Sequence, residues 1–286
     1  MDFQLINDLE TCRELLGISE AELVRRIGIS QMTLSRWKSN PDQISKNSLD
    51  KVYRFAYSEG IRLNRIKEQL YSEELNGTNS VLLFHGAKTE LNGPLSIQKS
   101  RSDNDFGKGF YCGESLEQSA MFVGGYQDSS IYALQFIRNP GLKQKKFGVN
   151  QEWMLTIALC RGRIEMYRDH PLIHKLSVNL KKCDYIIAPI ADNRMFQLID
   201  EFTEGEITDV QCQHALSATN LGNQYVFLND DTLQRVTVLE HCYLTEREKE
   251  DYLLRRQEEN RIGLDKVKIA KREYRGKGQY IDQLLS

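Results

Sequence analysis

Long apolar runs and paired metal or redox motifs are absent from this sequence. The longest apolar runs, such as Val81–Phe84 and Tyr185–Ala188, are far shorter than the ~18–20 residues that cross a bilayer, so we expect no membrane span. None of the 6 cysteines forms a C-x-x-C pair, and the one close histidine pair, His170 and His174, has no carboxylate at metal-ligand spacing. We therefore expect neither a disulfide framework nor a metal cofactor.

A secretory leader and a large net charge are also missing. The sequence opens with Met1-Asp2-Phe3-Gln4 and lacks the basic and apolar regions of a signal peptide, so we expect a cytoplasmic protein. Lys and Arg number 38 against 40 Asp and Glu, and 40% of the residues are hydrophobic. These ordinary values exclude collagen, coiled-coil rods and wholly disordered chains. A chain of 286 residues favours about two domains.

Two basic segments lie within the nearly neutral chain. Residues 25–54 contain seven Lys or Arg and two Asp, and residues 261–277 contain seven Lys or Arg and two acidic residues. A patch of this kind can meet a polyanion such as nucleic acid. The second segment is either a partner-binding surface or, as we favour, a solvated helix face.

The second basic segment belongs to a strongly charged stretch, residues 245–286. Leu253 and Leu254 lie there between ion-pair residues at helical spacing, so we predict an exposed helical tail. Glycines in its last part predict that the helix is interrupted, at Gly263, Gly276 and Gly278.

Residues 1–73 have the apolar spacing of short amphipathic helices. Ser19 and Glu22 have the pattern of a capping box, Gly28 ends the helix that follows, and a new helix begins after Ser30. The sequence therefore predicts a helix, a three-residue turn and a second helix.

The stretch from Glu20 to Trp37 resembles the helix-turn-helix of the Cro and lambda-repressor class. Its expected buried positions are Val24, Gly28, Ile29, Leu34 and Trp37. Val24 departs from the family, which usually has a small alanine there. A helical bundle used for dimerisation or protein contact is the alternative interpretation.

The resemblance implies that the second helix lies in the major groove of DNA. Gln31, Met32 and Ser35 would then read base edges, while Arg36 and Lys38 would contact phosphates. Proteins of this class usually bind palindromic DNA as dimers, so we expect a homodimer.

Residues 74–80 are polar and contain Gly77, and we interpret them as a linker. Residues 81–244 then predict a mixed α+β domain. Its strands are expected at Val81–Phe84, Ile131–Ile137, Tyr185–Ile190, Gln224–Leu228 and Val236–Tyr243, with helices at Glu152–Leu159 and Met195–Glu201. The expected fold class is α+β, with an all-α N-terminal domain, a mixed domain and a charged helical tail.

Three separated segments of the mixed domain share a pattern with a known superfamily. They are Phe84-His85-Gly86-Ala87, Asp105-Phe106-Gly107-Lys108-Gly109-Phe110-Tyr111 and Asn223-Gln224-Tyr225-Val226-Phe227. Together they resemble the His-Tyr-Glu arrangement of the diphtheria-toxin and poly-ADP-ribose-polymerase branch of ADP-ribosyltransferases. They resemble more closely an uncharacterised, mainly bacterial domain-of-unknown-function group of that superfamily, as does the block Asp184–Arg194.

The resemblance implies a binding site for NAD. His85, at the end of a strand, would hold the adenosine-side ribose, and Gly86, which adds no Cβ, would hold the nicotinamide amide. Tyr111, reached through the flexible turn Gly107–Gly109, would stack on the nicotinamide ring. Gly109 and Asn193 are the other expected NAD-binding residues.

The position that is usually Glu in the superfamily is Gln224 here. An amide can accept a hydrogen bond from a ribose hydroxyl, but it has no negative charge and cannot act as a base. Cleavage of the nicotinamide-ribose bond builds positive charge, so another carboxylate is expected nearby. We expect Asp105 to be that carboxylate, before Asp192 or Glu206, and we take Gln224 and Asp105 as the catalytic residues.

A DNA-binding domain joined to an NAD site suggests an intracellular ADP-ribosyltransferase, the toxin of a toxin–antitoxin or phage-defence system. NAD would be the co-substrate, and a protein side chain, a nucleic-acid base or water the acceptor, with NAD glycohydrolase activity on the side. A small antitoxin protein is a further candidate partner. The alternative is a transcription regulator that senses NAD or a related nucleotide without turning it over.

Overall fold

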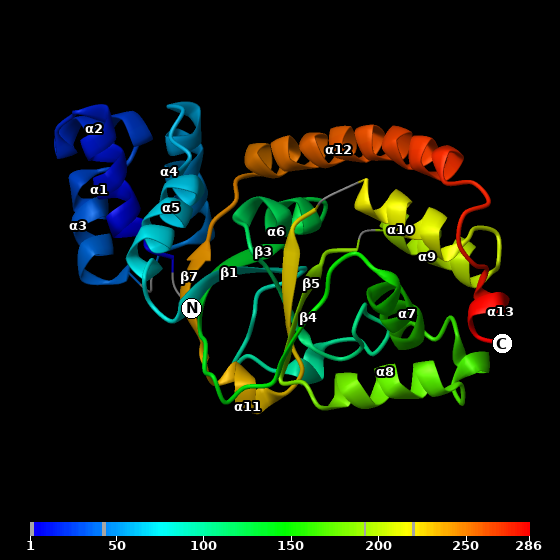
Figure 1. Ribbon diagram of the computed structural model, residues 1–286. Coiled ribbons are helices and arrows are strands. Elements are labelled where there is room, and N and C mark those ends of the chain that lie inside the picture. The colour runs from blue at the N-terminus through cyan, green and yellow to red at the C-terminus, as the bar shows by residue number, and fades with distance from the viewer. Residues whose placement is uncertain (1–2, 42–43, 192, 219–220) are drawn as a thin grey trace. The chain divides into compact units, whose positions relative to one another are not determined.

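The computed structural model describes residues 3–41, 44–191, 193–218 and 221–286, without the side chains of residues 193 and 194. The chain divides into two compact units that alternate along the sequence (Figure 1). The first unit comprises Met1–Leu91, Ser115–Phe136 and Thr237–Leu253, and the second comprises Asn92–Glu114, Ile137–Val236 and Leu254–Ser286.

The first unit begins with short helices. Among the residues described they are α1 (Leu5–Leu16), α2 (Glu20–Ile27), α3 (Gln31–Ser39), α4 (Lys46–Ser58) and α5 (Leu63–Leu75). The Ser19 hydroxyl accepts a hydrogen bond from the Glu22 N–H at 3.2 Å, and Gly28 ends α2 with a φ of 77°. The three-residue turn between α2 and α3 is therefore as predicted.

The apolar faces of these helices share one core, which includes Leu9, Val52 and Trp37. Val24, Leu34 and Trp37 are buried as expected, and Ile29 is half-buried. Gly28 is exposed, which corrects the expectation that it is buried. Its left-handed conformation turns the chain away at the end of α2, and nothing lies within 4 Å of where its Cβ would be.

The strands of the first unit lie in the order β1 (Ser80–Ala87), β3 (Ser130–Ile137) and β7 (Val236–Cys242). Helix α6 (Leu116–Val123), which the sequence pattern did not predict, packs on β1. A Cβ at Gly86 would lie 2.8 Å from the Ser119 carbonyl oxygen and 2.8 Å from Val123 Cγ1. The close approach of α6 therefore explains why this position lacks a side chain.

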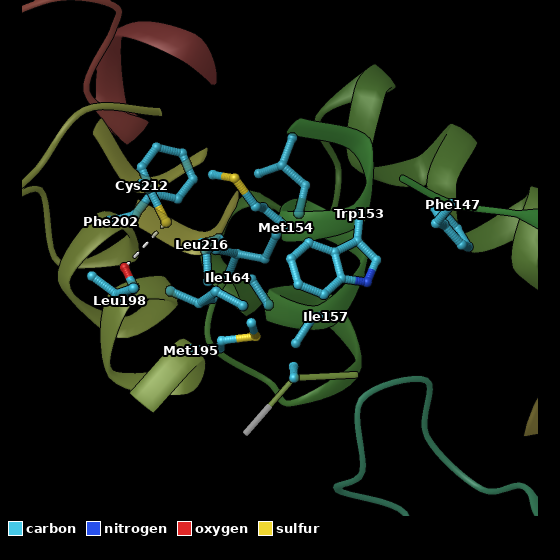
Figure 2. Close-up of a cluster of buried hydrophobic side chains, with 14 of the residues drawn as sticks. Phe147, Trp153, Met154, Ile157, Ile164, Met195, Leu198, Phe202, Cys212 and Leu216 are labelled. Carbon is cyan, nitrogen blue, oxygen red and sulfur yellow. Dashed lines mark hydrogen bonds between the residues drawn. The ribbon is translucent and has the colours of Figure 1, made fainter. Parts of the chain in front are cut away.

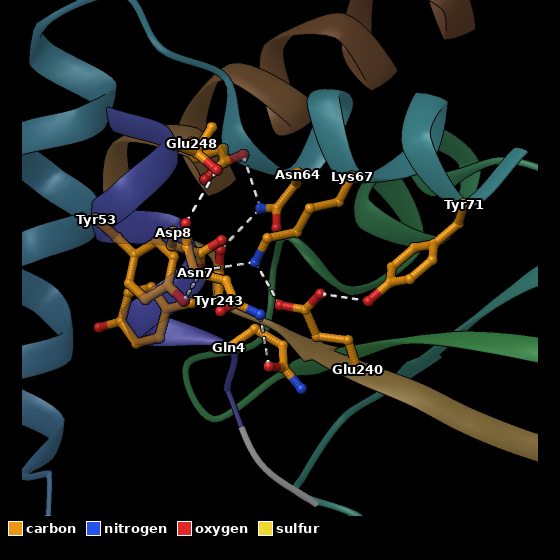
Figure 3. A network of polar contacts seen from close by, with 11 residues as sticks. Gln4, Asn7, Asp8, Tyr53, Asn64, Lys67, Tyr71, Glu240, Tyr243 and Glu248 are labelled. Atoms are coloured by element: carbon orange, nitrogen blue, oxygen red, sulfur yellow. Dashed lines mark hydrogen bonds and ion pairs between the residues drawn. The ribbon is translucent and has the colours of Figure 1, made fainter. Parts of the chain in front are cut away.

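Buried polar contacts join α1 and α5 to β7 (Figure 3). The Lys67 ammonium lies 2.7 Å from the Asp8 carboxylate and also contacts the Glu240 carboxylate. Tyr53 donates its hydroxyl to Asp8 at 2.5 Å, and Tyr71 donates to Glu240 at 3.0 Å. Every charged group of this cluster thus has a buried partner, as buried charges require.

The second unit contains a mixed set of strands in the order β4 (Gln144–Lys146), β5 (Tyr185–Pro189), β6 (Asn223–Phe227) and β2 (Phe110–Gly113). Strand β5 is parallel to β4 and antiparallel to β6, and β6 is antiparallel to β2. The predicted strands correspond to β1, β3, β5, β6 and β7. The short strands β2 and β4 were not predicted.

Helices pack on the strands of the second unit to form its core (Figure 2). Helices that contribute side chains to this core are α7 (Gln151–Cys160), α8 (Pro171–Lys181), α9 (Asn193–Thr203) and α10 (Asp209–Ser217). Trp153 of α7 and Phe202 of α9 are fully buried there with Ile186 of β5 and Val226 of β6. Short helical turns complete the unit at η2 (Ile97–Lys99), η3 (Glu165–Tyr167), α11 (Asp230–Leu233) and α13 (Ile281–Leu284).

The predicted tail contains one long helix, α12 (Glu246–Glu273). It passes through Gly263 without a break, which corrects the expected interruption there, whereas Gly276 and Gly278 follow its end with positive φ. Its first turns contain three buried residues, Glu248, Lys249 and Tyr252. This corrects the expectation that the tail is exposed. Among the described residues, no helix combines the length and apolar character needed to cross a membrane.

Candidate functional site

Asp105 and Gln224 meet inside the second unit although 119 residues separate them. The Gln224 Nε2 donates a hydrogen bond to Asp105 Oδ2 at 3.0 Å and a second to the Pro189 carbonyl oxygen at 3.3 Å. Only 8% of Asp105 and 7% of Gln224 are exposed. The structure thus brings together the two residues expected to be catalytic.

Strand pairing determines the position of Gln224. It lies on β6 opposite Gly113 of β2 and Ala188 of β5, so a strand flanks it on each side. The Pro189 carbonyl that accepts from its amide ends β5, in the block Asp184–Arg194 that the resemblance marked.

Tyr111 holds the loop that contains Asp105. The Tyr111 hydroxyl accepts from the Phe106 N–H at 3.1 Å and donates to the Gly107 carbonyl oxygen at 2.8 Å. Both directions of the hydroxyl are therefore used within the loop, and the half-buried ring packs against the core of the second unit.

Gly109 is placed by close packing. A Cβ there would lie 2.7 Å from Val226 Cγ1 and 3.0 Å from the Phe227 carbonyl oxygen, distances that real Cβ atoms rarely tolerate. Gly107, two residues earlier, has a φ of 74°. The segment Gly107–Gly109 is therefore a turn whose last residue packs against β6.

Arg161 completes this cluster and was not predicted. Its Nη2 donates to Asp105 Oδ1 at 3.1 Å, and its guanidinium carbon lies 3.1 Å from the centre of the Phe196 ring on α9. Arg161 follows the last residue of α7. A basic residue at a helix C-terminus is common, so the sequence offered no signal that this one pairs with Asp105.

Burial dominates the titration of this cluster. It raises the pKa of Asp105 above its ordinary value, while hydrogen bonds from Gln224 and Arg161 and the charge of Arg161 oppose the rise. Burial also raises the pKa of the neighbouring Cys160 thiol to about 12, with a smaller contribution from the charge of Asp105. Cys160 is thus a protonated thiol at neutral pH and a poor nucleophile.

Two of the remaining expected NAD contacts belong to the first unit. His85 is half-buried in β1 of the first unit, two residues before the strand ends, which corrects the expectation that it closes the strand. Gly86 lies beside it. Asn193 begins α9, but its side chain lies outside the described residues. Of the other two carboxylates considered, Glu206 is exposed, and Asp192 lies outside the described residues.

The expected DNA contacts share the exposed surface of α3. All of them are exposed, namely Gln31, Met32, Ser35, Arg36 and Lys38. Met32 is 82% exposed, which is unusual for a large apolar side chain. The Lys38 ammonium pairs with the Glu20 carboxylate of α2, whereas Arg36 has no ion-pair partner among the described residues.

These features define an α+β protein with helices in residues 5–75, strands arranged as a mixed sheet, and a long C-terminal helix. A family described as "Protein of unknown function (DUF3990)" matches residues 81–238, more than half of the chain. The protein belongs to this DUF3990 family. No curated protein and no solved structure matches the chain.

Proposed function

We propose that this protein is an NAD-dependent ADP-ribosyltransferase that binds DNA through its N-terminal helices. The contact between Asp105 and Gln224 is the observation that supports this proposal. The two residues come from two of the three segments that resemble the ADP-ribosyltransferase superfamily, and they form a buried polar pair. Buried, hydrogen-bonded titratable groups of this kind cluster at functional sites.

In the proposed reaction the bond between nicotinamide and the ribose carbon breaks, and its electron pair leaves with nicotinamide. An oxygen or nitrogen atom of the acceptor then bonds to the ribose carbon and releases a proton to water. Gln224 Oε1 would accept a hydrogen bond from a ribose hydroxyl, and the negative charge of Asp105 would favour the positive ribose. The Tyr111 ring would stack on nicotinamide, and Gly109 and Asn193 of the same unit would make further NAD contacts.

The proposal for DNA depends on the helix-turn-helix resemblance and on the exposure of α3. Gln31, Met32 and Ser35 would face the bases, with Arg36 on a phosphate. Lys38 would have to exchange its ion pair with Glu20 for a phosphate contact. A homodimer on a palindromic site and a toxin role with a small antitoxin protein are parts of the same proposal.

A second candidate function is a regulator that senses NAD without consuming it. Gln224 in place of Glu favours it, because an amide cannot supply the charge that the reaction needs. This candidate predicts DNA binding that depends on the nucleotide and leaves NAD intact.

The test is to incubate the full chain with adenylate-labelled NAD and either cell lysate or oligonucleotides. Nicotinamide release and transferred label are both followed. Gln224→Ala is measured in parallel, with Gln257→Ala on the exposed surface of α12 as the matched control.

Label on a macromolecule that disappears in Gln224→Ala and persists in Gln257→Ala supports a transferase and names the class of acceptor. Nicotinamide release without label indicates an NAD glycohydrolase. Binding of NAD with neither signal contradicts the enzyme and supports the sensing regulator.

A further inference from the structure

The Asp105 carboxylate lies between two donors from separate elements. Its Oδ1 accepts from Arg161 at the end of α7, and its Oδ2 accepts from Gln224 on β6. Both oxygens therefore accept hydrogen bonds from N–H groups, which is the pattern of an ionised carboxylate. A guanidinium contact favours the charged form as well.

This carboxylate determines which way the Gln224 amide faces. An ionised carboxylate can only accept, so the amide must turn its NH2 group toward Asp105. The Pro189 carbonyl oxygen, also an acceptor, faces the same nitrogen. Both amide hydrogens are then used, and Oε1 is left with no hydrogen-bond partner among the described residues, ready to accept from a ligand hydroxyl.

Arg161 is placed to hold the carboxylate. Its guanidinium stacks on the Phe196 ring and donates to Asp105 through Nη2. The Arg161 Nε is buried and has no hydrogen-bond partner in the part of the chain that the structure describes. Since an unpaired buried N–H is unfavourable, the stacking and the contact with Asp105 must keep the guanidinium in place.

We propose that Asp105, held by Arg161, is a positioning residue that fixes the Gln224 amide with its carbonyl oxygen toward a ribose hydroxyl of NAD. A single Glu would supply both the hydrogen-bond acceptor and the negative charge. In this protein Gln224 supplies the acceptor and Asp105 supplies the charge. This inference rests on the proposed ADP-ribosyltransferase. It also explains Gln at position 224, because a Glu there would place a second carboxylate against Asp105, and two carboxylates sharing one site cannot both ionise easily.

The pairing predicts that the two side chains can be exchanged. In the double variant Asp105→Asn, Gln224→Glu, the amide introduced at position 105 would accept from Arg161 through its oxygen and donate to the new carboxylate through its NH2. The polar contacts of the cluster would be kept with the charge moved to β6. The donation to the Pro189 carbonyl oxygen would be lost, and a carboxylate oxygen would face that carbonyl instead, so recovery below the wild-type rate is expected.

The experiment compares nicotinamide release by the wild type, Asp105→Asn, Gln224→Glu and the double variant. Each single variant should lose about tenfold or more, and the double variant should exceed both by about tenfold, a coupling typical of residues in one hydrogen-bond network. Arg161→Met should lose activity as Asp105→Asn does. The matched control is Arg168→Met, an arginine of the same unit whose side chain is 72% exposed.

A second measurement separates the pairing from the activity. Denaturant unfolding of the same four proteins should give non-additive midpoints, with the double variant more stable than the sum of the single changes predicts. If the wild type releases no nicotinamide, the proposed function is rejected. The unfolding measurements on the four proteins would still test whether Asp105 and Gln224 stabilise each other. An active wild type whose double variant is no better than either single variant, or additive midpoints, would overturn the inference.

Discussion

Lys67 of α5 and Glu240 of β7 form a buried ion pair although 173 residues separate them. Asp8 of α1 contacts the same ammonium, so one lysine faces two carboxylates. All three side chains are nearly inaccessible to solvent. The charge pair therefore depends on correct packing of the N-terminal helices against the edge strand of the first unit.

Replacing this lysine should strongly destabilise the protein. Lys67→Met leaves Asp8 and Glu240 buried without their cation, and breaking a buried pair in this way costs about 3–5 kcal/mol. Denaturant unfolding measures the loss. Lys51→Met, at an exposed lysine of α4, is the control and should change little. A stability of Lys67→Met equal to that of the wild type would contradict the importance of the pair.

Glu248 should make stability depend on pH. Burial raises the pKa of this carboxyl from 4.5 to about 7, and the Asn64 amide donates to it at 3.2 Å. As pH rises, the unfolded chain loses the Glu248 proton before the folded protein does. The free energy of unfolding therefore falls between about pH 4.5 and pH 7, by roughly 3 kcal/mol in all. Above about pH 7 this group causes no further loss of stability.

Glu248→Gln tests this dependence, because an amide does not titrate. Unfolding curves at several pH values should show a difference between wild type and variant that grows up to about pH 7 and then stays constant. Glu250→Gln, at an exposed position of the same helix, should follow the wild type. A difference independent of pH would show that burial does not raise the pKa of Glu248 in the folded protein.

A methyl group at position 109 should separate β2 from β6. Gly109→Ala would place its Cβ 2.7 Å from Val226 Cγ1 and 3.0 Å from the Phe227 carbonyl oxygen. Overpacking of this kind typically costs about 1–3 kcal/mol, and thermal unfolding would measure it. Gly148→Ala, with nothing within 4 Å, is the control. Adding Val226→Ala should recover part of the loss, and no recovery would point to the backbone contact with Phe227.

The Tyr111 hydroxyl and its ring should have separable effects. Tyr111→Phe removes the contacts with the Phe106 N–H and the Gly107 carbonyl oxygen, so it should destabilise the loop by about 1–3 kcal/mol. It keeps the ring that the proposal places on nicotinamide. Isothermal titration with NAD should therefore show weak effects for Tyr111→Phe and loss of binding for Tyr111→Ala. Equal NAD affinity of Tyr111→Phe and Tyr111→Ala would show that the ring does not contact NAD.

Arg36 should contribute to DNA affinity through charge. Arg36→Ala should weaken binding to all sequences about equally and reduce the slope of log affinity against log salt by about 1, as loss of one phosphate contact does. Fluorescence anisotropy with labelled duplexes at several salt concentrations measures both. Arg168→Ala is the exposed control in the second unit. An unchanged slope for Arg36→Ala would place the DNA contact elsewhere or exclude it.

Local patterns predicted much of the fold. The runs of β-branched and aromatic residues identified β1, β3, β5, β6 and β7, and the turn at Gly28 separated α2 from α3. Two helices that were not predicted begin with recognisable N-terminal sequence signals. Pro171 is at the first turn of α8, and Thr208 with Gln211 forms a capping box before α10. The strands β2 and β4 are too short for periodicity to identify them.

The candidate site was predictable only in part. Asp105 and Gln224 lie in segments with a recognisable pattern, and the structure places them in contact. Arg161 and Phe196 were missed because their roles depend on which helix end and which helix surface fold against Asp105. Contacts of this kind form between elements far apart in sequence, and no local spacing records them.

The Lys67 cluster also has a consequence for synthesis of the chain. The N-terminal helices leave the ribosome long before Glu240 is made, because residues emerge in order. Until then Lys67 lacks the Glu240 carboxylate, and the face of the helices that later meets β7 stays in water. The N-terminal helices should therefore complete their packing late, when nearly the whole chain has been translated, so nascent chains that end before residue 240 should be more sensitive to proteases there.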